Sequence, residues 1–375
     1  MRKKILLTAT VQSHVCQFHK PLVEMLREVG DYEIHVAARN NLAEKNGLRL
    51  DFVDRVFDIP FERAPFHPRN VMAYRMLNRV LRENEYEYIH CNTPVGGALT
   101  RLAAQKYRQR GAKVIYTAHG FHFYRGASRV NWMIYYPIER ILSCCTDCLV
   151  TVNSEDFTLA SAHFPCKVAR IHGVGVSDTR YSPVSEAESM ALRRELGFSP
   201  ESRVLLCVGE LNANKNQIMA IEAMELVVRR CPTAVLVMAG NGPESRELRE
   251  QVTARGLGAH VRFTGYCTTL ERYHRIADLG ISCSKREGLG LNVIEAMLTG
   301  NPVVATRNRG HTELIRHGEN GFLVEIGDAE GMADCVVRLL ENRELRCAMG
   351  RNGLESMMPY TYARVKRELR SVYFD

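Results

Sequence analysis

The sequence predicts an α/β protein made of two doubly wound domains in tandem. Short apolar segments rich in β-branched residues alternate with longer amphipathic segments along the chain. This alternation is typical of parallel strands that are buried on both faces and joined by helices. The chain has 375 residues, which exceeds the usual size of one hydrophobic core, so two domains are expected. Glycine, serine, aspartate and proline gather at Ile171–Pro183, and this stretch is the expected linker.

The first domain, residues 1–175, contains five expected strands. They are Lys4–Thr10, Ile34–Ala38, Tyr88–Cys91, Lys113–Thr117 and Cys148–Val152. Pro21–Val29 and Gly97–Arg110 have the amphipathic spacing of helices. Strands and helices that alternate in this order predict one parallel sheet with helices on both faces.

The second domain, residues 176–355, repeats the pattern. Its expected strands are Val204–Val208, Ala234–Ala239, Val261–Thr264, Leu279–Ser282 and Val303–Ala305, and its expected helices are Gln217–Arg229, Glu244–Arg255, Leu291–Thr299 and Ala329–Glu341. Both domains are thus expected to be Rossmann-like. Ligands of such sheets bind beyond the carboxyl ends of the strands, and the cleft between the domains is the expected active site.

The net charge of +8 comes from the first domain. Residues 1–175 carry 24 Lys and Arg against 16 Asp and Glu, whereas the remainder carries 26 against 26. A basic domain predicts an anionic partner, either phosphates, a membrane surface or nucleic acid, although a solubilising surface gives the same balance. The arginines from Arg63 to Arg82 alternate with apolar side chains, which is typical of a helix lying on a membrane or of an ordinary solvated helix. No nucleic-acid-binding module is recognisable, so nucleic acid is not an expected partner.

The expected compartment is the cytoplasm. The sequence shows neither a secretory signal nor an apolar run of about 20 residues. The twelve cysteines are scattered, mostly within apolar segments, which is typical of reduced, buried thiols. Peripheral contact with the cytoplasmic face of a membrane is compatible with these features.

The loop Gly209–Asn216 follows an expected strand and precedes an expected helix. A glycine directly after a strand lets the backbone approach a ligand closely, and a helix N-terminus attracts anions. Lys215 could therefore pair with a phosphate as a compact point charge, or it could be an ordinary solvated lysine. A second turn of this kind holds Gly240, but such turns occur in any α/β domain.

The segment Ser284–Met297 is more informative. Gly288 and Gly290 stand at the entry to a helix and would leave its first N–H groups free for an anion. Within one helix, Glu287 and Glu295 would lie about 12 Å apart along the axis, too far for an acid–base pair. With Glu287 in the glycine loop instead, the two carboxylates could bracket a ligand and accept hydrogen bonds from sugar and ribose hydroxyls.

This segment resembles the retaining GT-B glycosyltransferases of the family-4-like type, which carry two glutamates separated by seven residues. Three earlier segments fall in the order and spacing of that family: Gly209–Asn216, Gly240–Pro243 and Val261–Tyr266. The likeness covers essentially the whole chain and is strongest over residues 204–325. The segment Tyr116–Tyr124 resembles the transferases that assemble bacterial capsules and exopolysaccharides. The resemblance implies the GT-B fold, with a C-terminal helix in residues 356–375 that packs back on the first domain.

The resemblance also implies a role for each donor-site position. Lys215 would hold the donor diphosphate, Glu295 the ribose hydroxyls, and Tyr266 with Cys267 would border the nucleobase. The backbone at Leu289–Leu291 would cradle phosphate. The implied donor-binding residues are Gly209, Glu210, Lys215, Asn216, Gly240, Tyr266, Cys267, Gly288, Leu289, Gly290, Leu291 and Glu295.

Two residues are the implied catalytic ones. Glu287 would contact hydroxyls of the transferred sugar, and His119 matches the first-domain histidine that faces this sugar. His122 is the nearest competitor of His119 for that role. His14, His19 and His122 are expected on the acceptor side.

The chain departs from the family in two places. The family usually has an arginine after Gly209, which shares the diphosphate with the lysine, but here Glu210 takes that position. Many relatives also have a glycine-rich loop after the first strand. The corresponding Thr10–His19, expected to be a loop on the acceptor side, contains no glycine.

The implied reaction moves a hexose or N-acetylhexosamine from a UDP-sugar to an acceptor hydroxyl with retention. The implied acceptor is a polyprenyl-diphosphate-linked glycan. No Asp-x-Asp motif occurs, so the reaction is expected to need neither a metal nor another cofactor. Two alternatives stay open, a UDP-sugar 2-epimerase and a non-catalytic subunit that binds a UDP-sugar and activates a partner.

Overall fold

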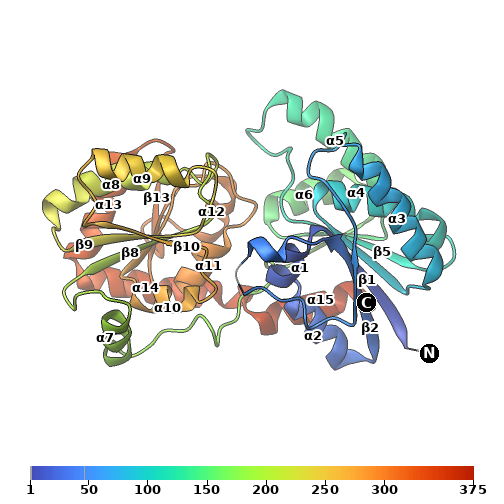
Figure 1. Ribbon diagram of the computed structural model, residues 1–375, viewed down its shortest axis with the longest axis horizontal. Helices are drawn as coiled ribbons and strands as arrows, with labels where there is room; N and C mark the ends of the chain where they lie inside the picture. The colour runs from blue at the N-terminus through green and yellow to red at the C-terminus, as the bar shows by residue number, and fades with distance from the viewer. Residues whose placement is uncertain (1, 46) are drawn as a thin grey trace. The chain divides into compact units, whose positions relative to one another are not determined.

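The computed structural model describes residues 2–45 and 47–375, and the chain divides into two compact units (Figure 1). Unit 1 consists of residues 1–175 and 362–375, and unit 2 of residues 176–361. The return to unit 1 begins at Tyr362, later than the expected residue 356. Helix α14 (Arg343–Met357) and the 3-10 turn η2 (Met358–Tyr360) still belong to unit 2.

Unit 1 contains a seven-stranded parallel sheet in the order β3-β2-β1-β4-β5-β6-β7. The strands are β1 (Lys3–Val11), β2 (Tyr32–Arg39), β3 (Arg55–Asp58), β4 (Tyr88–Asn92), β5 (Lys113–Ala118), β6 (Cys148–Thr151) and β7 (Lys167–Arg170). The five central strands match the expected ones. The edge strands β3 and β7 were missed, because each has four residues and charged side chains that hide the apolar pattern.

Helices cover both faces of this sheet. They are α1 (Gln12–Phe18), α2 (Lys20–Val29), α3 (Arg69–Glu83), α4 (Pro94–Arg108), α5 (Arg129–Ser143), α6 (Ser154–His163) and α15 (Tyr362–Phe374), with a 3-10 turn η1 (Leu42–Glu44). Helices α3, α4 and α5 lie on one face and α2 with α15 on the other (Figure 1). The expected loop at Thr10–His19 is wrong. Because no glycine or proline interrupts it, the chain continues as β1 to Val11 and then as α1, which buries Val15 and Cys16.

The C-terminal helix α15 is part of unit 1. The Tyr88 hydroxyl donates to the backbone oxygen of Tyr373 at 2.8 Å, and the Tyr373 hydroxyl lies 2.7 Å from Nδ1 of the buried His90. Lys366 forms ion pairs with Glu24 and Glu28 of α2. These contacts attach the end of the chain to β4 and α2.

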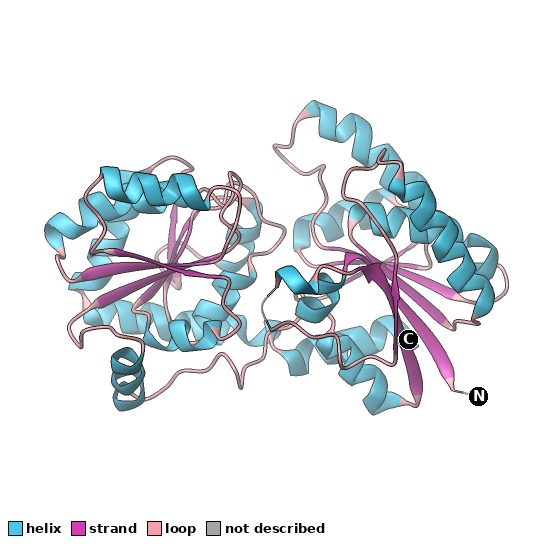
Figure 2. Cartoon of the chain, in the orientation of Figure 1, coloured by secondary structure: helices cyan, strands magenta, loops and turns pink. Residues whose placement is uncertain are grey.

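Unit 2 contains a six-stranded parallel sheet in the order β10-β9-β8-β11-β12-β13. The strands are β8 (Arg203–Val208), β9 (Ala234–Ala239), β10 (Val261–Gly265), β11 (Leu279–Ser282), β12 (Val303–Thr306) and β13 (Gly321–Val324). The remaining helices are α7 (Glu186–Glu195), α8 (Gln217–Arg230), α9 (Ser245–Ala254), α10 (Leu270–Ile276), α11 (Leu291–Leu298), α12 (Arg309–Leu314) and α13 (Ala329–Glu341). In each unit the sheet lies between layers of helices (Figure 2). The predicted pair of doubly wound α/β domains is confirmed.

Candidate functional site

Each sheet has one point at which the direction of winding reverses. In unit 2 the chain runs from β8 outward to β9 and β10, and from β11 in the opposite direction to β12 and β13. In doubly wound sheets, ligands bind at the carboxyl ends of two such neighbouring strands. The loops Gly209–Asn216 and Cys283–Gly290 follow β8 and β11. The two segments singled out from the sequence therefore flank the switch point of unit 2.

Lys215 and Glu287 form an ion pair across this switch point. Lys215 Nζ donates to Glu287 Oε1 at 2.6 Å, and the two side chains are 24% and 15% exposed. Two more hydrogen bonds join the same loops. Lys285 N donates to the backbone oxygen of Asn214 at 2.7 Å, and Asn214 Nδ2 donates to the backbone oxygen of Arg286 at 3.0 Å. The loops therefore form one connected structure around a partly buried cation.

Burial and charge act in opposite directions on Glu287. Burial raises the pKa of its carboxyl, but the neighbouring ammonium of Lys215 and its hydrogen bond outweigh burial and hold the pKa below the ordinary value. Glu287 is therefore ionised at neutral pH. A phosphate that binds Lys215 has to compete with this carboxylate.

Helix α11 begins at the switch point without a side-chain cap. Its N-cap is Gly290, whose φ of 103° lies in the left-handed region that favours glycine. Leu291 is the first helical residue, and the first turn holds no acidic side chain. Leu289 is buried and anchors the end of the loop, directly after Gly288. The uncapped N–H groups and the positive end of the helix dipole are suited to an anion.

Gly240 allows the ends of neighbouring strands to pack closely. A Cβ atom on Gly240 would lie 1.9 Å from the backbone oxygen of Gly209. Gly240 also forms an isolated bridge with Gly265 at the end of β10. Tyr266 and Cys267, the next residues, therefore lie at the same carboxyl edge of the sheet. The role of Gly240 in the structure is backbone packing beneath the loop that carries Lys215.

Glu295 lies within α11 and has partners different from those of Glu287. Its Oε2 is 3.7 Å from Nε2 of His274. The pKa of the Tyr181 phenol is raised, mainly by burial and to a smaller extent by the negative charge of Glu295. The rings of Tyr181 and His274 meet edge-on with centroids 5.4 Å apart, and both are buried. Two buried rings therefore form the surroundings of the Glu295 carboxylate.

Glu210 and Asn216 occupy the two ends of the Lys215 loop. The exposed Glu210 accepts a hydrogen bond from Asn212 Nδ2 at 3.0 Å, so its carboxylate is held by its own loop. Asn216 is buried and is the N-cap of α8, with a φ of 53°. Gln217 Nε2 donates to the backbone oxygen of Glu210 at 3.0 Å and closes the loop.

Sequence reasoning missed a buried network beneath the Glu287 loop. The His311 ring donates from Nδ1 to a backbone oxygen at 2.6 Å, so its Nε2 accepts from the Ser282 hydroxyl at 3.0 Å. Asn292 Nδ2 donates to the same hydroxyl oxygen at 3.1 Å. A Cβ atom on Gly310 would lie 2.6 Å from Cβ of Glu287. The lack of a side chain at Gly310 therefore leaves room for the Glu287 loop. The only sequence feature that could have indicated this network is the adjacent pair Gly310 and His311, which comes shortly after an expected strand.

Unit 1 has its switch point between β1 and β4. His14 lies on α1, Asn92 ends β4, and His119 follows β5. His119 Nε2 is 3.0 Å from Asn92 Oδ1 and 3.2 Å from His14 Nε2. Because Asn92 Nδ2 donates to the backbone oxygen of Thr8, its Oδ1 faces His119. Neutral His119 therefore carries its proton on Nε2, and its Nδ1 is the basic nitrogen.

Burial keeps four neighbouring histidines of unit 1 uncharged: His14, His19, His90 and His119. It lowers the pKa of His119 to about 4 and that of His90 to about 3. Burial, with repulsion between neighbouring imidazolium charges, also holds the pKa values of His14 and His19 well below the ordinary value. The four rings are neutral at pH 7, so their nitrogens can accept hydrogen bonds or protons.

His14, His19 and His119 each place one ring nitrogen within 4.8 Å of the other two. In the described part of the chain this is the one cluster of three side chains suited to a metal ion. The buried Nε2 of His19 has no hydrogen-bond partner among the described residues. His122 lies outside the cluster, and its ring stacks on Tyr135 with centroids 4.7 Å apart. The structure thus brings together three of the four predicted histidines.

Two strained residues mark the two switch points. Among the described residues, Thr93 (φ 64°) and Asn216 (φ 53°) are the non-glycine residues with positive φ. Thr93 follows β4, and its hydroxyl lies 2.7 Å from that of Thr10 in β1. Strain of this kind persists where the surroundings hold it and gathers at functional sites. Sequence reasoning missed Asn92 and Thr93, because neither has a distinctive spacing.

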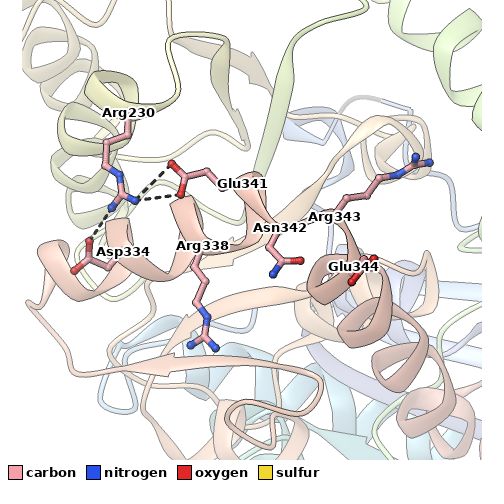
Figure 3. Close-up of a pocket in the computed structure, with 7 residues that line it drawn as sticks. All are labelled: Arg230, Asp334, Arg338, Glu341, Asn342, Arg343 and Glu344. Carbon is pink, nitrogen blue, oxygen red and sulfur yellow. Dashed lines mark hydrogen bonds and ion pairs between the residues drawn. The ribbon is translucent and has the colours of Figure 1, made fainter.

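A depression of about 560 Å³ lies at the opposite edge of the unit 2 sheet (Figure 3). Its lining comes from the end of α8 and from α13 and α14, so it lies near the amino ends of the strands. Arg230 is paired there with Asp334 at 3.5 Å and Glu341 at 3.2 Å. These exposed pairs leave little unbalanced charge, and the depression is separate from the switch point of unit 2.

Two family descriptions match the chain. "Glycosyl transferase 4-like" matches residues 4–153, and "Glycosyl transferases group 1" matches residues 189–356. The chain is 42% identical over 375 residues to EpsD of Bacillus subtilis (strain 168), itself provisionally named as a glycosyltransferase. This match covers 100% of the chain and 97% of EpsD. The chain belongs to the glycosyltransferases.

Two further proteins resemble this glycosyltransferase. One is the Escherichia coli UDP-Gal:alpha-D-GlcNAc-diphosphoundecaprenol alpha-1,3-galactosyltransferase, 25% identical over 82% of this chain and 81% of the relative. The other is Anabaena HepE, solved with UDP and glucose, with a TM-score of 0.80 and 20% identity over 99% of both chains. The GT-B fold is therefore confirmed.

Proposed function

We propose that this glycosyltransferase moves a hexose or N-acetylhexosamine from a UDP-sugar to an acceptor hydroxyl, with retention at the anomeric carbon. The observation that carries the proposal is the Lys215–Glu287 ion pair beside the uncapped start of α11. A donor diphosphate needs a cation and free N–H groups, and both occur at the switch point, where ligands of this fold class bind. The galactosyltransferase relative is named for a UDP-sugar donor, which supports the same donor class.

In the proposed reaction, the bond from the anomeric carbon to the diphosphate oxygen breaks, and a bond to the acceptor oxygen forms on the same face of the sugar. Negative charge grows on the departing diphosphate, and Lys215 with the first N–H groups of α11 stabilises it. The departing phosphate takes the acceptor proton, so no metal ion and no protein nucleophile is required. Glu287 and His119 contact the transferred sugar, and Glu295 accepts hydrogen bonds from the ribose hydroxyls.

The proposed acceptor is a polyprenyl-diphosphate-linked glycan used in capsule or exopolysaccharide synthesis. The galactosyltransferase relative is named for a diphosphoundecaprenol acceptor, which supports this class. None of the described helices is both long and apolar enough to cross a bilayer. We also propose that the chain reaches a membrane-anchored acceptor by peripheral contact at the cytoplasmic face.

A donor screen tests the proposal. The chain is incubated with each UDP-sugar and with GDP-mannose, with and without a short-chain polyprenyl-diphosphate sugar, and the released nucleoside diphosphate is measured. We expect one UDP-sugar to release UDP only when acceptor is present. The product should keep the anomeric configuration of the donor by NMR, and inversion would contradict retention.

The same screen separates the two alternatives. Conversion of a UDP-sugar into its epimer without acceptor would identify an epimerase. Binding of UDP without turnover of any donor would identify a non-catalytic subunit, the alternative that Glu210 in place of the family arginine keeps open. In that case, Glu210→Arg should tighten UDP binding without restoring transfer.

A further inference from the structure

One face of unit 1 exposes an unusual number of large apolar side chains. Nine of the fourteen such side chains among the described residues lie on three helices, α3, α4 and α5. They are Val71, Met72, Met76, Leu102, Val130, Met133, Ile134, Ile138 and Ile141. Helix α4 contacts both α3 and α5, and all three lie on the same face of the sheet (Figure 1). The apolar side chains therefore belong to one continuous layer of helices.

Helix α5 carries the clearest pattern. Its exposed apolar residues recur at spacings of three and four, from Val130 through Met133, Ile134 and Ile138 to Ile141, so they share one side of the helix. Met133 is 76% exposed and Ile141 is 68% exposed. The opposite side of α5 packs inward with Glu139, Leu142 and Ser143. The helix is thus amphipathic with its apolar side facing outward, the reverse of a solvated helix.

The charged residues of the same helices are almost all basic. Helices α3, α4 and α5 contain nine Lys and Arg and two Glu. Arg101 and Glu139 form a buried ion pair at 2.8 Å and cancel each other. Glu83 pairs with Arg79 at 2.7 Å. The eight basic residues outside the buried pair are Arg69, Arg75, Arg79, Arg82, Lys106, Arg108, Arg129 and Arg140.

We propose that this face, formed by α3, α4 and α5, docks on an anionic phospholipid bilayer. Outward apolar side chains flanked by cations match the boundary between anionic headgroups and acyl chains. In this arrangement the apolar row of α5 enters that boundary, and the arginines of α3 and α5 contact lipid phosphates. The functional meaning of the surface rests on the proposed lipid-linked acceptor. Docking itself requires neither donor nor acceptor.

Vesicle flotation of the full chain tests this surface. The probe is a phosphatidylcholine vesicle with or without phosphatidylglycerol, and the bound fraction is measured at low and high salt. One variant combines Met133→Ser with Ile141→Ser, and another combines Arg75→Gln with Arg82→Gln. The matched controls lie in unit 2 and are also exposed: Ile326→Ser with Met358→Ser for the apolar pair, and Arg351→Gln for charge.

We expect binding to require phosphatidylglycerol and to fall with salt, because the lipid charge is screened. The arginine variant should bind at least tenfold more weakly, since each cation near an anionic surface strengthens membrane binding roughly fivefold. The serine variant should also lose about tenfold, while both controls bind like the wild type. Equal binding to neutral vesicles, or variants indistinguishable from the controls, would overturn the proposal.

Two further measurements make each outcome decisive. Circular dichroism and UDP-induced thermal stabilisation of the serine variant should equal those of the wild type, because the mutated side chains lie in solvent. If size-exclusion chromatography shows a dimer that the serine variant dissociates, the face joins two copies of the chain and the membrane proposal is wrong. Transfer to a water-soluble acceptor tests the proposed function separately, because it should proceed in the serine variant even when vesicle binding is lost.

Discussion

The Nζ atom of Lys215 lies 2.6 Å from Oε1 of Glu287, and this ion pair joins the loops that follow β8 and β11. The chain leaves these two strands in opposite directions, so the pair spans the point of the sheet where a ligand is expected. The carboxylate neutralises the lysine when no donor is bound. If Lys215 holds the donor diphosphate as proposed, donor binding would exchange one anionic partner of Lys215 for another, without first exposing an uncompensated buried charge.

Lys215→Ala should weaken UDP binding at least tenfold, because the diphosphate loses its point charge. The measurement is the rise in melting temperature at increasing UDP concentration, which reports binding to the folded state. Arg351→Ala removes an exposed cation from α14 of the same unit and should leave the UDP response unchanged. An unchanged response in Lys215→Ala would remove this residue from the donor site.

Glu287→Gln should lower the free energy of unfolding at pH 7 by about 1.5–3 kcal/mol, the usual range for a hydrogen bond to a charged group. The folded-state pKa of Glu287 lies below the ordinary value of 4.5. Its contribution is therefore fully present above pH 4.5 and is lost as the pH falls through the folded-state pKa. The stability difference between wild type and variant should shrink over that acidic range.

Denaturant titrations at several pH values measure this difference. Glu250→Gln is the matched control, because Glu250 pairs with Arg246 in an exposed i,i+4 pair. Glu250→Gln should lower the free energy of unfolding by less than about 0.5 kcal/mol. A difference for Glu287→Gln that grows toward acidic pH would contradict the assigned ion pair.

Gly240→Ala should destabilise unit 2 by about 1–3 kcal/mol, the usual cost of overpacking. The added Cβ atom would lie 1.9 Å from the backbone oxygen of Gly209, so the Lys215 loop has to shift and UDP binding should weaken as well. Gly258→Ala is the control, because no atom lies within 4 Å of a Cβ atom there. Equal stability of both variants by thermal melting would show that the strand ends tolerate a side chain.

The fold and the position of the Lys215 and Glu287 loops at the carboxyl ends of their strands could be predicted from the sequence, because apolar strands alternate with helices in chain order. Parallel topology then places the ends of β8 and β11 side by side, so the Lys215 and Glu287 loops meet although 72 positions separate them. The helix α1 was missed for a different reason. A loop was expected at Thr10–His19 because many relatives have a glycine-rich loop after the first strand, but the segment from Gln12 to Phe18 contains neither glycine nor proline and forms a helix.

Other parts of the site have no local sequence signal. Asn92 matters because its amide is fixed by Thr8 and orients His119, a relationship between three strands that no spacing reveals. The buried hydrogen bond between His311 and Ser282 likewise joins positions 29 apart. The Glu210 carboxylate would repel a bound phosphate. The sequence could not indicate that Asn212 donates a hydrogen bond to this carboxylate and holds it within its own loop.

His119→Ala should abolish sugar transfer and leave UDP affinity unchanged, because His119 lies in unit 1 and Lys215 in unit 2. His122→Ala should retain transfer, since the His122 ring stacks on Tyr135 outside the histidine cluster. UDP release and UDP-induced stabilisation are measured for both variants. Retained turnover in His119→Ala would refute its catalytic assignment, and loss of transfer only in His122→Ala would move the role to that residue.

EDTA should leave transfer unchanged, whereas micromolar Zn²⁺ should inhibit it. His14, His19 and His119 place ring nitrogens within 4.8 Å of one another, and neutral imidazoles are good ligands for zinc. A bound ion would compete with the proposed contact between His119 and the transferred sugar. His14→Ala removes one ligand and should raise the Zn²⁺ concentration needed for half-inhibition at least tenfold, roughly the loss seen when a coordination site is impaired.

The control is His67→Ala, which removes an exposed histidine of unit 1 and should leave this concentration unchanged. Loss of transfer in EDTA would instead mean that the reaction needs a metal, and equal Zn²⁺ sensitivity of His14→Ala and wild type would place the inhibitory ion elsewhere.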